Sequence, residues 1–410
     1  MQKLFFVYGK TPSLSRAELF AVLRALYGSN AFREVSRGQH YSIMNCSAAN
    51  IDVPALQRRL GCTVKIGKIL FQPKPTSSIF AAIQNTVTEN VLSSFFSHDD
   101  QTHSFGWSLY TSDGSEPFRL TRELHRHGIA LKSALRANGI RASFIQLKGS
   151  ELSSVAISKE HMLDRGAEFC VFLEPHQIAI GRTMTVQDFR DFSARDYGRP
   201  GHDDVSGMLP PKLAMMMINL SGVAINGTLL DPFCGSGTIL TESLAMGMTQ
   251  LIGSDISERA IDDTRNNLEW TMQHLGLHTE HEIPLYVQDA KSLEKIIPPE
   301  SIDAVVTEPY LGPPLRGRES PEIISNNIRT LQQLYQQWID QFYRVLKPHG
   351  RFVMVIPHFR IQGKMLSMHL EWRRFTRDPF SSPTLPNGGL VYQRQNQFVV
   401  REIVVGTKRK

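Results

Sequence analysis

The sequence predicts an α/β protein with an open, mostly parallel seven-stranded sheet in its C-terminal half and two smaller α/β units before it. From residue 223 onward, short apolar runs alternate with helical patterns, the order that builds a parallel sheet with crossover helices. Near the end of the chain, apolar runs at 390–394 and 398–405 flank a short polar segment. They predict a β-hairpin that gives the sheet an antiparallel edge strand.

Residues 1–75 form the first predicted unit. Ser15 and Glu18 have the spacing of a capping box, which predicts a helix that begins at Ser15. Further patterns predict strands at 4–8, 41–44 and 64–71 and a helix at 54–60. This alternation indicates a βαββαβ, ferredoxin-like domain. The proline-rich segment 72–78 that follows predicts a linker.

Residues 76–185 form a second predicted α/β domain, and residues 186–222 link it to a third domain at 223–410. In the second domain we expect helices at 79–95 and 119–138, strands at 104–110 and 143–146, and a closing hairpin of 169–173 and 177–183. In the third we expect strands at 228–230, 251–254, 285–287, 302–306 and 351–356, and long helices at 257–275 and 325–346.

A basic stretch lies in the second domain. Between positions 119 and 148, Glu123 alone opposes seven basic residues, which are Arg119, Arg122, Arg126, Lys132, Arg136, Arg141 and Lys148. Such a stretch is either a solvated helix face or a surface that contacts phosphates. Because the whole chain also carries a net charge of +6, we favour an RNA-binding surface.

The segment 227–238 is the most informative motif of the chain. An apolar strand ends at Asp231, Gly235 and Gly237 follow, and a helix is expected to open at Thr238. Glycines allow backbone to approach a ligand, and a helix start offers free N–H groups, so the pattern predicts a nucleotide-binding turn. Leu240 occupies the place of the third glycine of a dinucleotide fingerprint, and no phosphate-loop Gly-Lys-Ser/Thr is present. The acidic residue before the glycines suits a ligand with an amine and a sulfonium.

Two further carboxylates follow predicted strands. Asp255 lies at the end of the second strand, where it is placed to accept both hydroxyls of a ribose or, alternatively, to cap the next helix. Asp289 lies at the end of the third strand, where it is placed to accept from an adenine amine.

The fourth strand ends in Glu308, Pro309 and Tyr310. Tyr310 offers a ring on which a planar base can stack. Glu308 and a neighbouring carbonyl oxygen offer acceptors for an exocyclic amine. Acceptors that draw the amine protons out of the ring plane restore nucleophilicity to the nitrogen, so attack on a sulfonium methyl needs no metal ion.

This series of motifs resembles that of S-adenosylmethionine-dependent amino-methyltransferases. Arg190–Pro200, Met208–Ala214 and Ile218–Leu220 are in addition similar to the segment before the catalytic domain in THUMP-domain tRNA guanine-N2 methyltransferases, which modify guanosine at tRNA position 10. The resemblance implies a Rossmann-like class I methyltransferase domain over 223–410 and a THUMP-like RNA-binding domain over 76–185. It also implies S-adenosylmethionine as cofactor and tRNA as partner.

The resemblance assigns roles to residues of this chain. The implied catalytic residues are Glu308, Pro309 and Tyr310, which would receive a flipped guanine. The implied cofactor-binding residues are Asp231, Phe233, Gly235, Gly237, Thr238, Asp255, Ile256, Asp289 and Ala290. Residues around 199–211 would help to close the cofactor pocket. The family tetrad is usually Asp or Asn, Pro, Pro, Tyr, so either Thr307 or Glu308 fills the acidic place here, and we favour Glu308 because it carries charge.

Other classes of site are disfavoured. His274, His278 and His281 lack a joining acidic or cysteine motif, so we expect no metal. Four distant cysteines without a C-x-x-C pair suit a reducing cytosol, and the first apolar run is too short for a signal peptide. We expect a cytoplasmic monomer without a membrane span. The number of methyl groups added and the need for an activating protein partner stay open. Two alternatives also remain: methylation of a ribosomal RNA guanine or an adenine amine, and an RNA-binding protein without catalysis.

Overall fold

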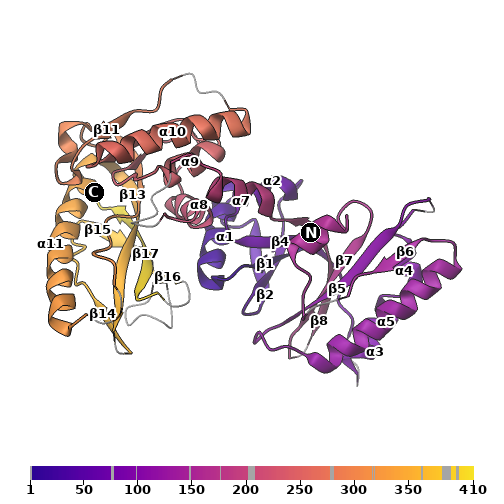
Figure 1. The fold of residues 1–410 in the computed structure, drawn as a ribbon. Helices are drawn as coiled ribbons and strands as arrows, with labels where there is room; N and C mark the ends of the chain where they lie inside the picture. The colour runs from indigo at the N-terminus through magenta and orange to yellow at the C-terminus, as the bar shows by residue number, and fades with distance from the viewer. Residues whose placement is uncertain are drawn as a thin grey trace. The chain divides into compact units, whose positions relative to one another are not determined.

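The structure is a computed structural model that describes residues 2–74, 78–97, 99–146, 149–175, 177–201, 208–277, 281–315, 317, 319–361, 363–380, 389–393 and 397–410. The chain divides into two compact units, one of residues 1–12 and 23–189 and one of residues 13–22 and 190–410 (Figure 1). Helix α1 (Pro12–Tyr27) contributes to both units.

In the described part of the first unit, one mixed sheet has the strand order β2-β3-β1-β4-β8-β7-β5-β6. Its strands are β1 (Gln2–Tyr8), β2 (Phe32–Arg37), β3 (Tyr41–Cys46), β4 (Thr63–Phe71), β5 (His103–Thr111), β6 (Ala142–Phe144), β7 (Ala167–Leu173) and β8 (Ile178–Val186). Its other helices are α2 (Val53–Arg59), α3 (Ile79–Thr86), α4 (Glu89–Ser93), α5 (Phe118–Ala137) and α6 (Ser154–Lys159). The predicted boundary near residue 75 does not interrupt the sheet, because β4 pairs with β8 in antiparallel fashion.

Three local predictions for this unit differ from the structure. Helix α1 begins at Pro12, so Ser15 and Glu18 are buried within the helix and do not cap it. Proline fits the first helical turn, where its missing N–H has no intrahelical partner. The helix predicted at 79–95 is two short helices, because Thr88 is extended and starts α4. Strand β6 is shorter than predicted and ends at Phe144.

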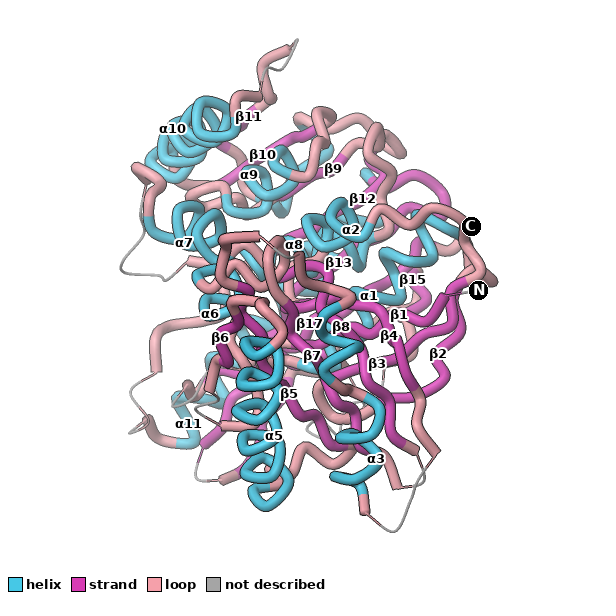
Figure 2. Tube along the Cα trace, turned by 90° about the vertical axis from the view of Figure 1, so that its right-hand side faces the viewer, coloured by secondary structure: helices cyan, strands magenta, loops and turns pink. Residues whose placement is uncertain are grey.

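Helix α5 covers the β5–β6 side of this sheet (Figure 2). Its buried leucines recur at helical spacing and pack with Phe105, Trp107 and Phe169 of the strands. The opposite face of α5 is exposed, and it carries Arg119, Arg122 and Arg126.

In the described part of the second unit, the sheet has the order β11-β10-β9-β12-β13-β17-β15, with β14 paired to β13 and β16 paired to β17. Its strands are β9 (Leu229–Asp231), β10 (Leu251–Asp255), β11 (Leu285–Val287), β12 (Ile302–Thr307), β13 (Leu346–Ile361), β14 (Lys364–Ser367), β15 (Phe375–Arg377), β16 (Leu390–Tyr392) and β17 (Val399–Lys408). Its other elements are α7 (Phe189–Tyr197), α8 (Pro211–Ser221), α9 (Thr238–Ala245), α10 (Glu258–Leu275), the 3-10 helix η1 (Ala290–Lys295) and α11 (Pro321–Val345).

Strands β11, β10, β9, β12 and β13 pair in this order in parallel, as predicted, whereas β13 pairs with β17 in antiparallel fashion. The predicted pairing of the last two apolar runs is present, because β16 and β17 are antiparallel. The prediction that this hairpin gives the sheet an antiparallel edge strand is confirmed, because among the described strands β16 pairs with β17 alone, on the side of β17 that faces away from β13. Residues 394–396 of the hairpin lie outside the described residues. Helix α11 packs Tyr335, Trp338 and Phe342 against the sheet and lies on the opposite side of it from α8 (Figure 1).

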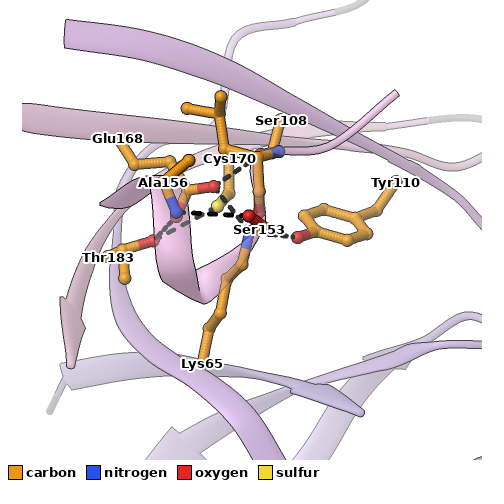
Figure 3. A network of polar contacts seen from close by, with 9 residues as sticks. Lys65, Ser108, Tyr110, Ser153, Ala156, Glu168, Cys170 and Thr183 are labelled. Carbon is orange, nitrogen blue, oxygen red and sulfur yellow. Dashed lines mark hydrogen bonds and ion pairs between the residues drawn. The ribbon is translucent and has the colours of Figure 1, made fainter. Parts of the chain in front are cut away.

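A buried polar network joins the two halves of the first sheet (Figure 3). Lys65 of β4 is 2% exposed and donates to Glu168 Oε1 of β7 at 2.6 Å and to the Leu152 carbonyl oxygen at 2.6 Å. The hydroxyl groups of Ser108 and Thr183 also donate to the Glu168 carboxylate. Burial lowers the pKa of Lys65, but the Glu168 carboxylate together with Cys170 and Glu151 outweighs this effect and leaves that pKa above its usual value.

This ion pair gives a test of the shared sheet. Replacing Lys65 with Met should leave the Glu168 carboxylate buried without a cation and lower the free energy of unfolding of this unit by about 3–5 kcal/mol. Denaturant-dependent hydrogen exchange of peptides from β4 and β7 measures the change. In the double variant K65M/E168M we expect part of the loss to be recovered. The control is Lys68→Met on the exposed side of β4, which should change stability by less than about 0.5 kcal/mol. Equal losses in K65M and K68M would contradict the account.

Candidate active site at the strand ends

The registers of the second sheet bring its polar strand ends together. Asp231 of β9 is opposite Gly253 of β10, and Asp255 of β10 is opposite Val287 of β11. On the other side, Leu230 is opposite Val305 of β12. Because these strands are parallel, Asp231, Asp255, Asp289 and Glu308 all lie at the same carboxyl edge of the sheet. Open α/β sheets bind ligands at this edge.

The glycine turn between β9 and α9 has the geometry that only glycine adopts readily. Gly235 has φ +53° and Gly237 has φ +82°. A Cβ atom on Gly235 would meet nothing within 4 Å, so the turn leaves open space at this position, whereas a Cβ on Gly237 would lie 2.9 Å from Thr264. The positive φ of Gly235 favours glycine in an open position, whereas Gly237 in addition needs its missing side chain because Thr264 packs against it.

Side chains of helix α10 donate hydrogen bonds to the backbone of this turn. Thr264 donates from Oγ1 to the Gly235 carbonyl oxygen at 2.7 Å. Asn267 donates from Nδ2 to the Ser236 carbonyl oxygen at 2.7 Å and also binds both backbone groups of Gly201. Sequence reasoning missed Thr264 and Asn267. Their signal in the sequence was their helical spacing on the buried face of α10, which they share with Ile261, Leu268 and Thr271.

The first residues of the segment 199–211, which was predicted to close the cofactor pocket, contact the same turn. Arg199 is 2% exposed and donates from Nη1 to Thr238 Oγ1 at 3.0 Å. Together with the Gly201–Asn267 bonds, this contact places residues 199–201 beside the start of α9. Residues 202–207, in the middle of the predicted segment, lie outside the described part of the chain.

Asp231 is the most buried acid of the site, at 1% exposed. Its Oδ1 accepts from the Phe233 backbone N–H at 3.2 Å and from Thr307 Oγ1 at 2.7 Å. Burial raises the pKa of Asp231 to about 7, against these two hydrogen bonds, and the nearby Asp255 and Glu308 carboxylates raise it further. Asp231 is therefore a carboxyl group whose ionisation is costly until a positive charge comes close to it.

Asp255 and Asp289 both have structural partners. Asp255 accepts from the Gly235 N–H through Oδ2 and from the Ser257 N–H through Oδ1, each at 3.0 Å. The alternative that Asp255 caps α10 is wrong, because the residue whose side chain caps this helix is Ser257. Asp289 caps η1 by accepting from the Lys291 N–H at 2.9 Å, and it also pairs with the Lys291 ammonium at 3.0 Å.

The remaining predicted cofactor residues lie in different surroundings. Ile256 is 72% exposed beside Asp255, where it offers an apolar surface to a ligand. Ala290 is buried. Phe233 packs edge-on against Trp338 with ring centroids 4.6 Å apart. Phe233 therefore supports the turn from the core.

The predicted catalytic loop separates the roles of Thr307 and Glu308. Thr307 is fully buried, and its hydroxyl group donates a hydrogen bond to Asp231 Oδ1. Glu308 lies just beyond the strand, 14% exposed, and its Oε1 accepts from Arg401 Nε at 2.6 Å. Tyr310 is 55% exposed. Of Thr307 and Glu308, Glu308 is therefore the one with an accessible acceptor.

The predicted RNA-binding residues do not form one uniform surface. Arg119, Arg122, Arg126, Arg136 and Arg141 are exposed and Lys132 is half-buried, while Lys148 lies outside the described residues. Arg141 pairs with Asp100 at 3.3 Å, and Arg136 donates to the Ala142 carbonyl oxygen at 3.0 Å. The exposed arginine stripe of α5 is thus Arg119, Arg122 and Arg126.

Two other features bear on the class of protein. Among the residues that the structure describes, no group of three His, Cys, Asp or Glu side chains is placed to hold a metal ion. His274 stacks on Trp270 with ring centroids 4.7 Å apart, and His278 lies outside the described range. No helix in the described part of the chain is both long and apolar enough to cross a membrane.

Comparison with known proteins places this site in a family context. The family model of an RMKL-like methyltransferase domain matches residues 200–382. The tRNA (guanine(10)-N2)-dimethyltransferase of Methanothermobacter thermautotrophicus is 36% identical over 168 residues, which are 40% of this chain and 43% of that protein. The probable tRNA (guanine(10)-N2)-dimethyltransferase of Methanothermococcus thermolithotrophicus is 38% identical over 120 residues, which are 28% of this chain and 70% of the relative.

One solved structure shares the fold over the whole length. TrmN from Thermus thermophilus superposes with a TM-score of 0.58 at 16% identity, covering 99% of both chains. The alignment with the first curated relative spans less than half of that relative's length. The fold comparison therefore covers the whole chain, whereas the sequence identity is confined to a part of it.

The raised pKa of Asp231 gives a pH prediction. An unfolded aspartate titrates near pH 3.9, while Asp231 in the folded chain titrates near pH 7. Between these values the native state holds a proton that the unfolded chain has lost, so this group makes stability fall as pH rises from about 4 to about 7. Asp231→Asn should therefore be more stable than the wild type at pH 8, by up to about 4 kcal/mol.

Denaturant unfolding at pH 5 and pH 8 measures this difference. We expect the advantage of Asp231→Asn over the wild type to be larger at pH 8 than at pH 5. The control variant Asp262→Asn removes an exposed acid of α10 and should show no such pH dependence. If Asp231→Asn differs from the wild type equally at both pH values, Asp231 does not titrate in this window.

Proposed function

The chain belongs to the methyltransferase family of these relatives, and from this premise we propose that it transfers methyl groups from S-adenosylmethionine to the N2 amine of a guanosine in tRNA, at position 10. The observation that carries the proposal is the convergence of Asp231, Asp255, Asp289 and Glu308 on one sheet edge, beside a glycine turn with open space at Gly235. The names of the curated relatives supply the tRNA substrate and the nucleotide position.

The residues at the sheet edge fit the proposed cofactor. The open side of Gly235 lets backbone approach a ligand, and the costly negative charge of Asp231 favours a cationic one. We assign Asp231, Gly235, Gly237 and Thr238 to the methionine part, Asp255 with Ile256 to the ribose, and Asp289 with Ala290 to the adenine. S-adenosylmethionine supplies an electrophilic methyl group on a positively charged sulfur.

Glu308 and Tyr310 act on the target base in this proposal. The exposed ring of Tyr310 stacks on the extruded guanine, and the buried Pro309 fixes the loop between the two residues. Glu308 accepts a hydrogen bond from the N2 amine and directs its lone pair out of conjugation with the ring. The nitrogen gains the methyl group, the electron pair of the broken bond stays with the donor, and the released proton leaves through Glu308 to water.

The first unit binds the RNA in this proposal. We assign residues 1–75 as a ferredoxin-like domain and residues 76–185 as a THUMP-like domain. The strand and helix order over 2–71 and the exposed arginines of α5 support these assignments. The four cysteines form no disulfide bond, which supports a reducing, cytoplasmic setting.

The direct test is nucleoside mass spectrometry of unmodified tRNA incubated with the protein and S-adenosylmethionine. We expect N2-methylguanosine or its dimethyl form, mapped to position 10. A methylated adenine, or a product found only in ribosomal RNA, would replace the proposed substrate. Binding of tRNA with no cofactor binding by calorimetry would favour an RNA-binding protein without catalysis.

Glu308→Gln tests the catalytic assignment. The amide keeps the size of the side chain and removes its negative charge, so we expect kcat to fall by about 10²–10³-fold. Cofactor affinity, measured by calorimetry, should stay close to that of the wild type. The control Glu322→Gln changes an exposed glutamate of α11 and should keep the wild-type rate. An unchanged kcat in Glu308→Gln would remove Glu308 from the mechanism.

The arginine stripe of α5 tests the RNA-binding assignment. Replacing Arg119, Arg122 and Arg126 with Gln should weaken tRNA binding and reduce the slope of log affinity against log salt by about 2–3. Filter binding over a range of salt concentrations measures both quantities. The control Arg24→Gln changes an exposed arginine of α1. If the triple variant keeps the wild-type slope, the RNA binds elsewhere.

A further inference from the structure

The Glu308 carboxylate has a cationic partner from a distant part of the chain. Arg401 lies on β17 and donates from Nε to Glu308 Oε1 at 2.6 Å. In the sheet, β13 separates β17 from β12, the strand that ends just before Glu308. Arg401 is opposite Pro357 of β13, so its side chain reaches across one strand. The tertiary fold therefore builds this contact without a local motif.

A second hydrogen bond also holds the Arg401 side chain in place. Its Nη1 group donates to Gln397 Oε1 at 3.3 Å, and the side chain is only 14% exposed. The next residue, Glu402, faces the other side of the strand, where His358 and Arg377 bind it at 2.8 and 2.9 Å. In the described part of the chain, Glu308 is thus the one acidic partner of Arg401.

The contact between Arg401 and Glu308 uses only one of the two carboxylate oxygens of Glu308. Arg401 occupies Oε1, and no described residue donates a hydrogen bond to Oε2. An amine that enters the site therefore finds an acceptor whose position is already fixed. Orientation of this kind lowers a barrier because the side chain does not have to be ordered during the reaction.

The charge of Arg401 matters as well as its position. Asp231, Asp255 and Glu308 are close enough for the last two to raise the pKa of the first. Of these three acids, Glu308 is the one that contacts a cation among the described residues. Arg401 therefore offsets part of the repulsion that gathering three carboxylates creates.

We propose that Arg401 is a positioning residue for methyl transfer, because it holds the Glu308 carboxylate with one oxygen engaged and the other ready to accept from the target amine. This inference rests on the proposed function and adds to it a residue that lies outside the strand-end motifs. A glutamate has one more rotatable bond than the aspartate or asparagine that the motif usually carries. Arg401 removes that extra freedom.

The test uses the full chain with the variants R401M, R401K, E308Q and R401M/E308Q. Steady-state methylation of unmodified tRNA gives kcat and KM, and calorimetry gives the cofactor affinity. We expect R401M to lower kcat by about 10²-fold while KM and cofactor affinity change by less than about twofold. R401K should restore kcat to within about tenfold of the wild type, because a lysine can make the same single contact. The double variant should be no slower than E308Q.

The matched control is R360M. Arg360 lies on the neighbouring strand β13 and pairs with the neutral Gln393 at 3.1 Å, so its loss should leave kcat unchanged. A wild-type kcat in R401M, or losses in R401M and E308Q that multiply in the double variant, would overturn the inference. If R401M is poorly folded, a folded R401K without rescue overturns it as well. If the wild-type protein methylates no guanosine in this assay, the proposed function is wrong, and the inference that rests on it is wrong as well.

Discussion

Four neighbouring strands of the second sheet, β11, β10, β9 and β12, run in the same direction, and this parallel pairing forces their polar ends onto one edge. The arrangement gathers carboxylates at one edge, and the pKa of Asp231 is raised there, first by its burial and further by the nearby Asp255 and Glu308 carboxylates. A positively charged ligand at this edge would lower the cost of ionising Asp231. The same constraint that builds the sheet therefore also prepares a site for a cation.

Two of the buried acids in the described part of the chain, Glu168 and Asp231, differ in how completely the protein pairs them. Glu168 is fully buried, yet Lys65, Ser108 and Thr183 all donate to it, so its charge is satisfied within the protein. Asp231 accepts only from Thr307 and the Phe233 backbone and has no cation among the described residues. Of these two acids, the one that the protein pairs less completely therefore lies at the carboxyl ends of the strands, where a ligand could supply the missing partner.

Much of the second unit could be predicted from sequence, because continuous apolar runs such as 304–306 and 352–356 mark buried parallel strands. Strands β14 and β15 could not, since Lys364–Ser367 and Phe375–Arg377 are short and have no clear apolar pattern. The joining of β4 to β8 depends on pairing between distant segments, which no local pattern encodes. In the site, the strand-end acids follow from motif spacing, whereas Thr264, Asn267 and Arg401 act through tertiary contacts and carry no motif.

Contacts from both sides of the sheet edge support the site. On one side, Thr264 and Asn267 of α10 fix the backbone of the glycine turn. On the other side, Arg401 of β17 fixes Glu308. Both sets of contacts form within the protein itself, so the ordering entropy of the turn and of the proposed catalytic carboxylate is lost during folding rather than during binding. In the proposed reaction, an acceptor that is preorganised in this way can act on a base that occupies the site only briefly after it is extruded.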